Sequence, residues 1–123
     1  MRCYKCGSVL SANDICPKCQ TDVSIYKKTA MASDVYYNKA LEKARLRDLS
    51  GAIETLKVSL MINKYNINAR NLLGLIYLEE GEIVAALSEW VISRHYQAEN
   101  NDAEDYIRQI QSNPNRLETY NQT

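Results

Sequence analysis

Four cysteines close to the start of this sequence are the side chains best suited to chemistry. They form two pairs, Cys3 with Cys6 and Cys16 with Cys19, and two residues separate the members of each pair. This gap lets both thiolates of one turn point at a common centre, and Gly7 permits the left-handed backbone that follows the second ligand. Nine residues lie between the pairs, enough for a tight hairpin that brings them together. The spacing predicts one closed tetrahedral site that holds a single structural Zn²⁺, without the open position of a catalytic metal.

This pattern resembles the short zinc ribbons found at the N-termini of many bacterial proteins. Two alternatives remain open: a pair of redox-active or disulfide-forming motifs, and a rubredoxin-like iron site. A redox motif of thioredoxin type needs a βαβ context, which the sequence around Cys16 lacks. The segment has too few apolar residues to fold by burial alone, so metal binding, worth on the order of ten kcal/mol in small sites, must drive its folding. We therefore assign residues 1–22 to a zinc ribbon and residues 23–123 to a second domain.

The rest of the chain has the pattern of helices. Residues 20–24 read as a linker, and beyond them apolar residues recur at helical spacing. Only three glycines follow Gly7, and only one proline follows Pro17. Nothing in this stretch alternates with the period of a strand, so the fold class is predicted to be all-α.

A repeat is visible within the helical stretch. Residues 48–56 align with residues 82–90 at an offset of 34, and both copies share an acidic residue, an apolar residue, a small residue, an alanine and later a bulky apolar residue. The second copy resembles the tetratricopeptide repeat (TPR) family through Leu73-Gly74, Tyr77, Ala86 and Trp90, with a glycine at position 81 between its helices. The expected helix pairs are 26–47 with 49–63 and 67–80 with 83–96, and a further helix over 102–111 is expected to cap the array before Asn113-Pro114.

The first copy departs from the family pattern. Lys39 and Lys43 stand where the pattern has Leu and Tyr, and Arg47 replaces the turn glycine. An unrelated bundle of helical hairpins is therefore the alternative to a TPR-like array of two repeats plus a capping helix. Two repeats are fewer than the three that solenoids usually need, and the residues from Arg116 onward resemble the start of another helix. We therefore expect the chain to be part of a longer protein.

Composition narrows the function classes. Lys plus Arg and Asp plus Glu each number 15, so net charge gives no broad attraction to nucleic acid or to anionic lipid. No apolar run is long enough for a secretory signal or a membrane span, and the chain is expected in the cytoplasm, where thiols stay reduced. His95 is the only histidine, and neither a phosphate-binding glycine loop nor a nucleophile elbow is present. Enzyme activity is not expected.

The TPR resemblance implies a non-catalytic scaffold or adaptor that binds a peptide or a helix of another protein. In this family the first helix of each pair lines the concave, partner-binding surface. By position, the candidate partner-binding residues are Tyr37, Leu41, Arg45, Asn71, Leu75, Leu78 and Asp105. Another part of the same protein could instead cover this surface, or the chain could self-associate. The alternative function is a nucleic-acid-associated regulator whose ribbon contacts phosphates through Arg2, Lys5, Lys18, Lys27 and Lys28.

Overall fold

The computed structural model describes residues 1–112 and has five helices over that range. Residues 1–23 precede the helices, and we call them the metal-binding segment because their four cysteines could hold a metal ion. Residues 113–123 lie outside the described part, as does the predicted Asn113-Pro114 boundary. The helices are α1 (Ser24–Arg45), α2 (Leu49–Ile62), α3 (Ile67–Glu79), α4 (Ile83–Tyr96) and α5 (Ala103–Gln111). Residues 1–112 contain no strand, only isolated bridges near the cysteines, and the predicted all-α class is confirmed.

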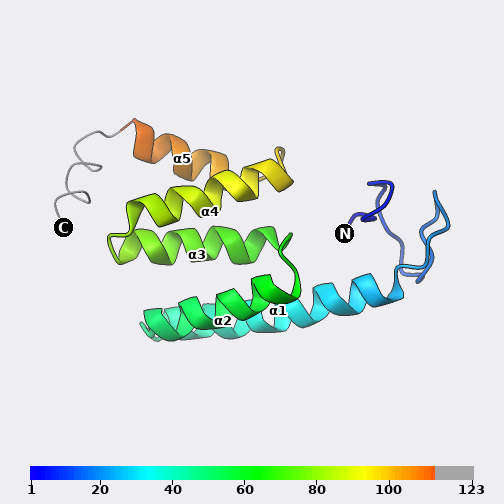
Figure 1. The fold of residues 1–123 in the computed structure, drawn as a ribbon, viewed down its shortest axis with the longest axis horizontal. Coiled ribbons are helices and arrows are strands. Elements are labelled where there is room, and N and C mark those ends of the chain that lie inside the picture. Colours follow the sequence, from blue (N-terminus) through cyan, green and yellow to red (C-terminus); the bar gives the residue numbers. More distant parts are fainter. Residues whose placement is uncertain (113–123) are drawn as a thin grey trace.

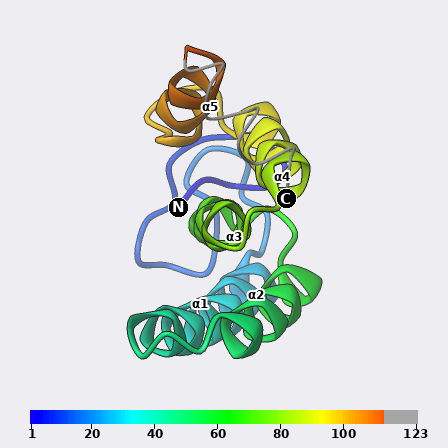
Figure 2. The same ribbon diagram turned by 90° about the vertical axis from the view of Figure 1, so that its left-hand side faces the viewer.

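The helices pack in chain order, each against the next, and the closest associations are α1 with α2 and α3 with α4. In the end-on view of Figure 2, α1, α3 and α5 follow one another along one side, and α2 and α4 along the other. Helix α1 has 22 residues and α2 has 14, so the first turns of α1 extend past α2 toward the N-terminal segment (Figure 1). None of the helices in residues 1–112 combines the length and the apolar character that crossing a bilayer needs.

Polar residues at the loops set where helices begin. The Asp48 carboxylate accepts the N–H of Gly51 at 3.1 Å and starts α2, and the Asn66 side chain accepts the N–H of Ala69 at 3.1 Å and starts α3. The start of α1 was predicted at residue 26, but the helix begins two residues earlier. There the Asp22 carboxylate accepts the N–H of Ser24 at 2.9 Å, which satisfies a donor that the first turn leaves free.

The repeat offset of the sequence recurs in the geometry of the turns. Helix α3 ends at an offset of 34 from the end of α1, and both ends of α4 lie at the same offset from those of α2. Three backbone hydrogen bonds close each turn between paired helices, and all three recur at this offset. Arg47 has φ 64° and Gly81 has φ 82°, so both turns use a left-handed residue at the equivalent position. The prediction that the first helix continues to residue 47 was wrong, because the chain leaves α1 at Arg45 to form this turn.

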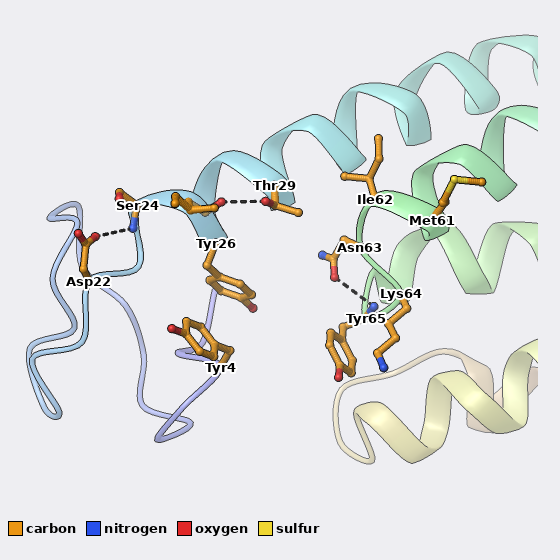
Figure 3. Close-up of a pocket in the computed structure, with 11 residues that line it drawn as sticks. Tyr4, Asp22, Ser24, Tyr26, Thr29, Met61, Ile62, Asn63, Lys64 and Tyr65 are labelled. Carbon is orange, nitrogen blue, oxygen red and sulfur yellow. Dashed lines mark hydrogen bonds between the residues drawn. The ribbon is translucent and has the colours of Figure 1, made fainter.

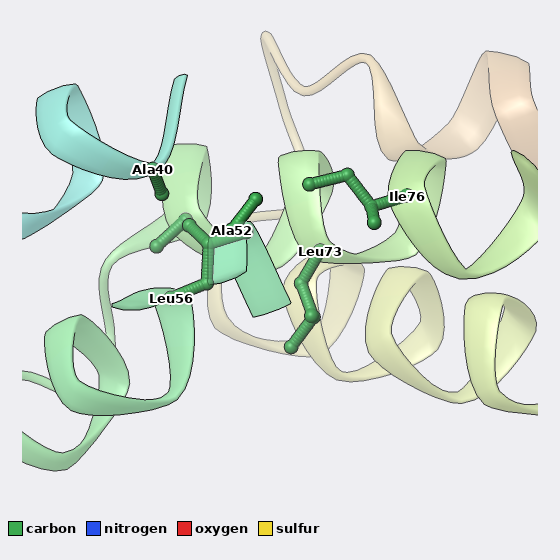
Figure 4. Close-up of a cluster of buried hydrophobic side chains, with 6 residues drawn as sticks. Ala40, Ala52, Leu56, Leu73 and Ile76 are labelled. Carbon is green, nitrogen blue, oxygen red and sulfur yellow. The ribbon is translucent and has the colours of Figure 1, made fainter. Parts of the chain in front are cut away.

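The buried core also follows this offset. In the first hairpin Ala40 and Leu56 are fully buried, and at the equivalent positions of the second hairpin the buried Gly74 packs against the fully buried Trp90 (Figure 4 shows the first pair). A small residue on one helix faces a large one on its partner in each hairpin, which lets the helices approach closely. Trp90 is thus the core anchor that the sequence predicted.

Helix α5 covers one end of the array. Its buried residues Ala103, Ile107 and Ile110 lie at the repeat offset from the buried Ala69, Leu73 and Ile76 of α3. The apolar face of α5 packs against the core around Trp90, while its other face carries charged side chains. The predicted capping helix therefore has the same buried pattern as the first helix of a pair.

Candidate metal centre

The metal-binding segment is built from two similar turns, which are related by an offset of 13 in the sequence. Antiparallel bridges join Arg2 to Val9 in the first turn and Ile15 to Asp22 in the second. In the first turn the N–H of Cys3 donates to the carbonyl of Ser8, and the N–H of Gly7 donates to the carbonyl of Cys3. Both hydrogen bonds recur at the equivalent atoms of the second turn. The local backbone is therefore the same on both sides of the site.

Each turn needs a left-handed residue directly after its second cysteine. Gly7 has φ 78° and Gln20 has φ 60° at the equivalent position. A glycine adopts this conformation without steric cost, whereas a side chain at such a φ costs about 1–2 kcal/mol. The glutamine indicates that the chain accepts this strain to keep the second turn in the shape of the first.

The two turns bring the four cysteine sulfurs together. The Sγ atoms of Cys3, Cys6, Cys16 and Cys19 all lie within 4.8 Å of one another. Sγ of Cys3 lies 3.7 Å from Sγ of Cys19, and Sγ of Cys6 lies 3.5 Å from Sγ of Cys16. Four sulfurs around Zn²⁺ at about 2.3 Å would be spaced about 3.8 Å apart. The cysteines are free rather than disulfide-bonded, and their arrangement can hold one metal ion in the geometry that zinc prefers.

Hydrogen-bond donors surround the sulfurs. The hydroxyl of Ser8 lies 3.1 Å from Sγ of Cys6 and 3.2 Å from Sγ of Cys16. At the position equivalent to Ser8 in the second turn, the hydroxyl oxygen of Thr21 accepts a hydrogen bond from Sγ of Cys19 at 3.1 Å. The Lys5 N–H donates to Sγ of Cys3 at 3.4 Å. Such donors stabilise the negative charge of thiolates, which is the form that binds a metal.

The same contacts change the acidity of the thiols. The backbone N–H of Cys19 and then the Ser8 hydroxyl lower the pKa of Cys16 to about 5. The hydroxyl and the backbone N–H of Ser8 also lower the pKa of Cys6. At Cys3 the backbone N–H of Cys6 lowers the pKa, but burial and the neighbouring thiols outweigh it, and the net pKa is raised. Two thiols are therefore predisposed to ionise, as a closed thiolate site requires.

The metal-binding segment is joined to the helices at the start of α1. The ammonium group of Lys27 donates to the backbone carbonyls of Ser11 and Asn13. The rings of Tyr4 and Tyr26 lie 5.2 Å apart, and Val23 is fully buried beside the cysteines. These contacts hold the segment against the start of α1.

Two hollows lie where the segment faces the helices. The first, which we call the apolar hollow, has a volume of about 820 Å³ and lies between Tyr4 and Tyr26 on one side and Met61, Ile62 and Tyr65 on the other (Figure 3). The second, which we call the amide cleft, has a volume of about 1000 Å³. Its walls are rich in amide side chains, which are Asn63, Asn66, Asn68, Asn71, Gln97, Asn100 and Asn101.

The predicted partner-binding residues occupy different environments. Tyr37 and Leu78 pack partly buried against the core, and Leu41 is also half-buried. Leu75 is 37% exposed. Arg45 and Asp105 are exposed, and a guanidinium nitrogen of Arg45 lies 3.6 Å from a carboxylate oxygen of Glu42. Among the seven, only Asn71 lines the amide cleft.

Sequence reasoning missed most of the amide cleft. Its lining includes Arg2 and Tyr4 from the metal-binding segment and the asparagines of the α2–α3 and α4–α5 loops. The density of asparagine and glutamine in residues 63–71 and 97–101 was a signal that could have been noticed. The contribution of the N-terminal residues could not, because it depends on how the segment folds back.

Comparisons with known proteins give no relative for this chain. No family model matches it, and neither the curated proteins nor the solved structures yield a match.

Proposed function

We propose that this chain is a non-catalytic adaptor in which a TPR-like array of helical hairpins binds a peptide or a helix of a partner protein. A zinc ribbon, loaded with one structural Zn²⁺, would hold the N-terminal end of the array. Because this ribbon needs reduced thiols, the proposal also places the protein in the cytoplasm, where thiols stay reduced.

The observation that carries this proposal is the recurrence of structure at an offset of 34 along the chain. It extends over the ends of α1 and α3 and of α2 and α4, the hydrogen bonds of the turns, and buried positions that α2 shares with α4 and α3 with α5. Between α1 and α3 it holds for Ala40 and Gly74. Repeats of this length are typical of TPR proteins, in which each helical hairpin buries its apolar face only by stacking on its neighbours.

Stacking of this kind leaves the first helices of successive pairs side by side. Helix α1 contacts α3 directly as well as α2. On this side Leu41 is half-buried and Leu75 is 37% exposed, so both offer apolar surface to a partner. Helix-in-groove and peptide-in-groove recognition both depend on such apolar anchors.

The charges favour a protein partner over nucleic acid. Two of the five basic side chains proposed to contact phosphates are already engaged within the ribbon. Arg2 donates to the carbonyl of Gly7 at 3.1 Å, and Lys27 donates to carbonyls of the ribbon loop. Because phosphate binding draws on free cationic side chains, this engagement weakens the nucleic-acid alternative.

The test is affinity capture with a matched pair of variants, followed by mass spectrometry. The double variant Leu41→Glu, Leu75→Glu places two carboxylates on the proposed surface. The control Val84→Glu places one on α4 at a position that is 71% exposed and lies on the second helix of its pair. We expect the double variant to lose partners that the wild type and the control retain, with all three proteins showing the same helical circular dichroism. Equal capture by all three would refute the proposed surface.

The presence of zinc in the protein is tested by elemental analysis. We expect one zinc ion per chain in protein purified without added metal. A native protein that contains iron, or one with two disulfides in place of a metal, would contradict the ribbon assignment.

A further inference from the structure

The amide cleft is used neither by the metal centre nor by the apolar surface of the proposed function. It lies between the metal-binding segment and the loops α2–α3 and α4–α5. Its volume of about 1000 Å³ is large enough for several residues of an extended chain.

Several amide groups of the cleft have hydrogen-bonding capacity that the described residues do not use. The side chains of Asn68 and Asn100 are exposed and form no hydrogen bond with any residue of 1–112. The half-buried Asn63 accepts the N–H of Tyr65 through Oδ1, but its Nδ2 donates to none of these residues. An amide side chain has N–H donors and a C=O acceptor, so it can pair with both the C=O and the N–H of a peptide group. The cleft can therefore bind a ligand that alternates donors and acceptors.

Asn71 adds a buried acceptor at the same wall. Its Nδ2 donates to Oδ1 of Asn101 at 2.8 Å, and that oxygen also accepts the N–H of Ala103 at 3.0 Å. Because Oδ1 of Asn101 is fixed as an acceptor, the amide of Asn71 cannot be turned around. Oδ1 of Asn71 is then left buried without a partner among the described residues, in a residue that lines the cleft.

The charges of the lining do not favour an anionic ligand. Arg2 and the α-amino group of Met1 are the positive groups of the lining, and Asp34 and Asp102 are its acidic side chains. These charges balance, so the cleft lacks the positive excess that attracts phosphates. Four tyrosines, at positions 4, 26, 65 and 96, supply aromatic surface between the amides.

We propose that the amide cleft binds an extended polypeptide segment through its main chain. The asparagines of the two loops and of the first turns of α3 pair with peptide N–H and C=O groups, and the tyrosine rings contact the side chains of the bound segment. Recognition of this kind tolerates many ligand sequences. Because Arg2 and Tyr4 form one wall, binding requires the folded metal centre. This inference rests on the proposed function in that the partner is a protein, but it places the main-chain contacts at a different surface.

The test begins with a random library of 12-residue peptides displayed on phage and selected on the zinc-loaded protein. Enriched peptides are synthesised, and their dissociation constants are measured by fluorescence anisotropy. We expect the double variant Asn68→Ala, Asn100→Ala to bind at least tenfold more weakly than the wild type. The control Asn38→Ala, which removes an exposed asparagine of α1 outside the cleft, should leave the dissociation constant unchanged. Removal of zinc by a chelator should abolish binding while the helical circular dichroism is retained.

A second measurement separates main-chain from side-chain recognition. N-methylation of individual amides in a selected peptide should weaken binding tenfold or more at two or more positions, whereas most alanine substitutions should change it less than threefold. No enriched peptide, or binding that ignores N-methylation, would overturn the inference. Peptides whose binding is lost in the Leu41→Glu, Leu75→Glu variant but unchanged in the Asn68→Ala, Asn100→Ala variant would support the proposed function and still overturn the inference.

Discussion

Gly74 is a position where one added methyl group should have a large effect. A Cβ at this residue would lie 2.6 Å from Cε2 and 2.7 Å from Cδ1 of Trp90, and in contact with its Nε1. The indole is fully buried and its Nε1 donates to the carbonyl of Asn71 at 3.3 Å, so the ring has little room to move. The variant Gly74→Ala therefore forces the ring and the helices around it apart.

The size of the effect follows from two opposing terms. Overpacking a closed core costs about 3 kcal/mol at the upper end of its range, whereas alanine is about 1 kcal/mol better than glycine inside a helix. The net loss in free energy of unfolding is about 2 kcal/mol, which lowers the melting temperature by about 8 °C in a protein of this size. Thermal and urea unfolding followed by circular dichroism at 222 nm measure this loss in zinc-loaded protein.

The first hairpin provides the control. It carries Ala40 and Leu56 where the second hairpin has Gly74 and Trp90. In a Trp90→Leu background the added methyl group meets free space, so Gly74→Ala should stabilise the protein by about 1 kcal/mol. The double-mutant cycle is then expected to give a coupling of about 3 kcal/mol. Equal effects of Gly74→Ala in both backgrounds would refute the pairing of small and large residues.

Three further predictions concern the left-handed turns and the metal site. Gly7→Ala should weaken zinc binding about tenfold, and Gln20→Gly should strengthen it about fivefold, because a side chain at positive φ costs about 1–2 kcal/mol. Competition with a chromophoric chelator measures the zinc affinity of both variants. In the same assay Ser8→Ala should weaken zinc binding about tenfold through loss of a hydroxyl that lies within hydrogen-bond distance of two cysteine sulfurs and can donate to one of them, and an unchanged affinity would contradict that contact. Arg47→Gly should raise the free energy of unfolding by up to about 1 kcal/mol despite the loss of an exposed ion pair, whereas Gly81→Ala should lower it by about 1 kcal/mol. A fall for Arg47→Gly or a rise for Gly81→Ala in urea unfolding would disprove the shared turn geometry.

Helix bounds could be predicted to within two residues because the residues that begin and end helices act on neighbouring backbone groups. Asp48 and Asn66 begin helices by accepting N–H groups of the following turn, and both are visible as capping residues. The end of α1 was misplaced because its left-handed turn residue is Arg47, which gives no sequence signal, whereas Gly81 does. A strained conformation of an ordinary residue can be found only in the structure.

The clustering of the four cysteines could be predicted from the sequence, because the spacing within and between the two pairs lets their sulfurs meet. The duplication behind it was missed, although Cys3 and Cys16, and Ser8 and Thr21, match at an offset of 13. The amide cleft could be predicted only in part: its amides are dense in residues 63–71 and 97–101, but the cleft forms between segments that are distant in the chain. Its position depends on contacts such as Lys27 with the ribbon loop and Tyr4 with Tyr26.

The placement of the single tryptophan has a consequence for spectroscopy. Trp90 is sealed between α3 and α4, and its ring lies 5.3 Å from that of Tyr106 on α5. Its fluorescence should therefore be blue-shifted in the native protein and should report on the second hairpin and its covering helix. The N-terminal ribbon and the first hairpin contain no indole, so loss of the metal should leave the emission maximum in place. The rate of change of tryptophan fluorescence can thus measure unfolding of the second hairpin and α5 separately from unfolding of the N-terminal part of the chain.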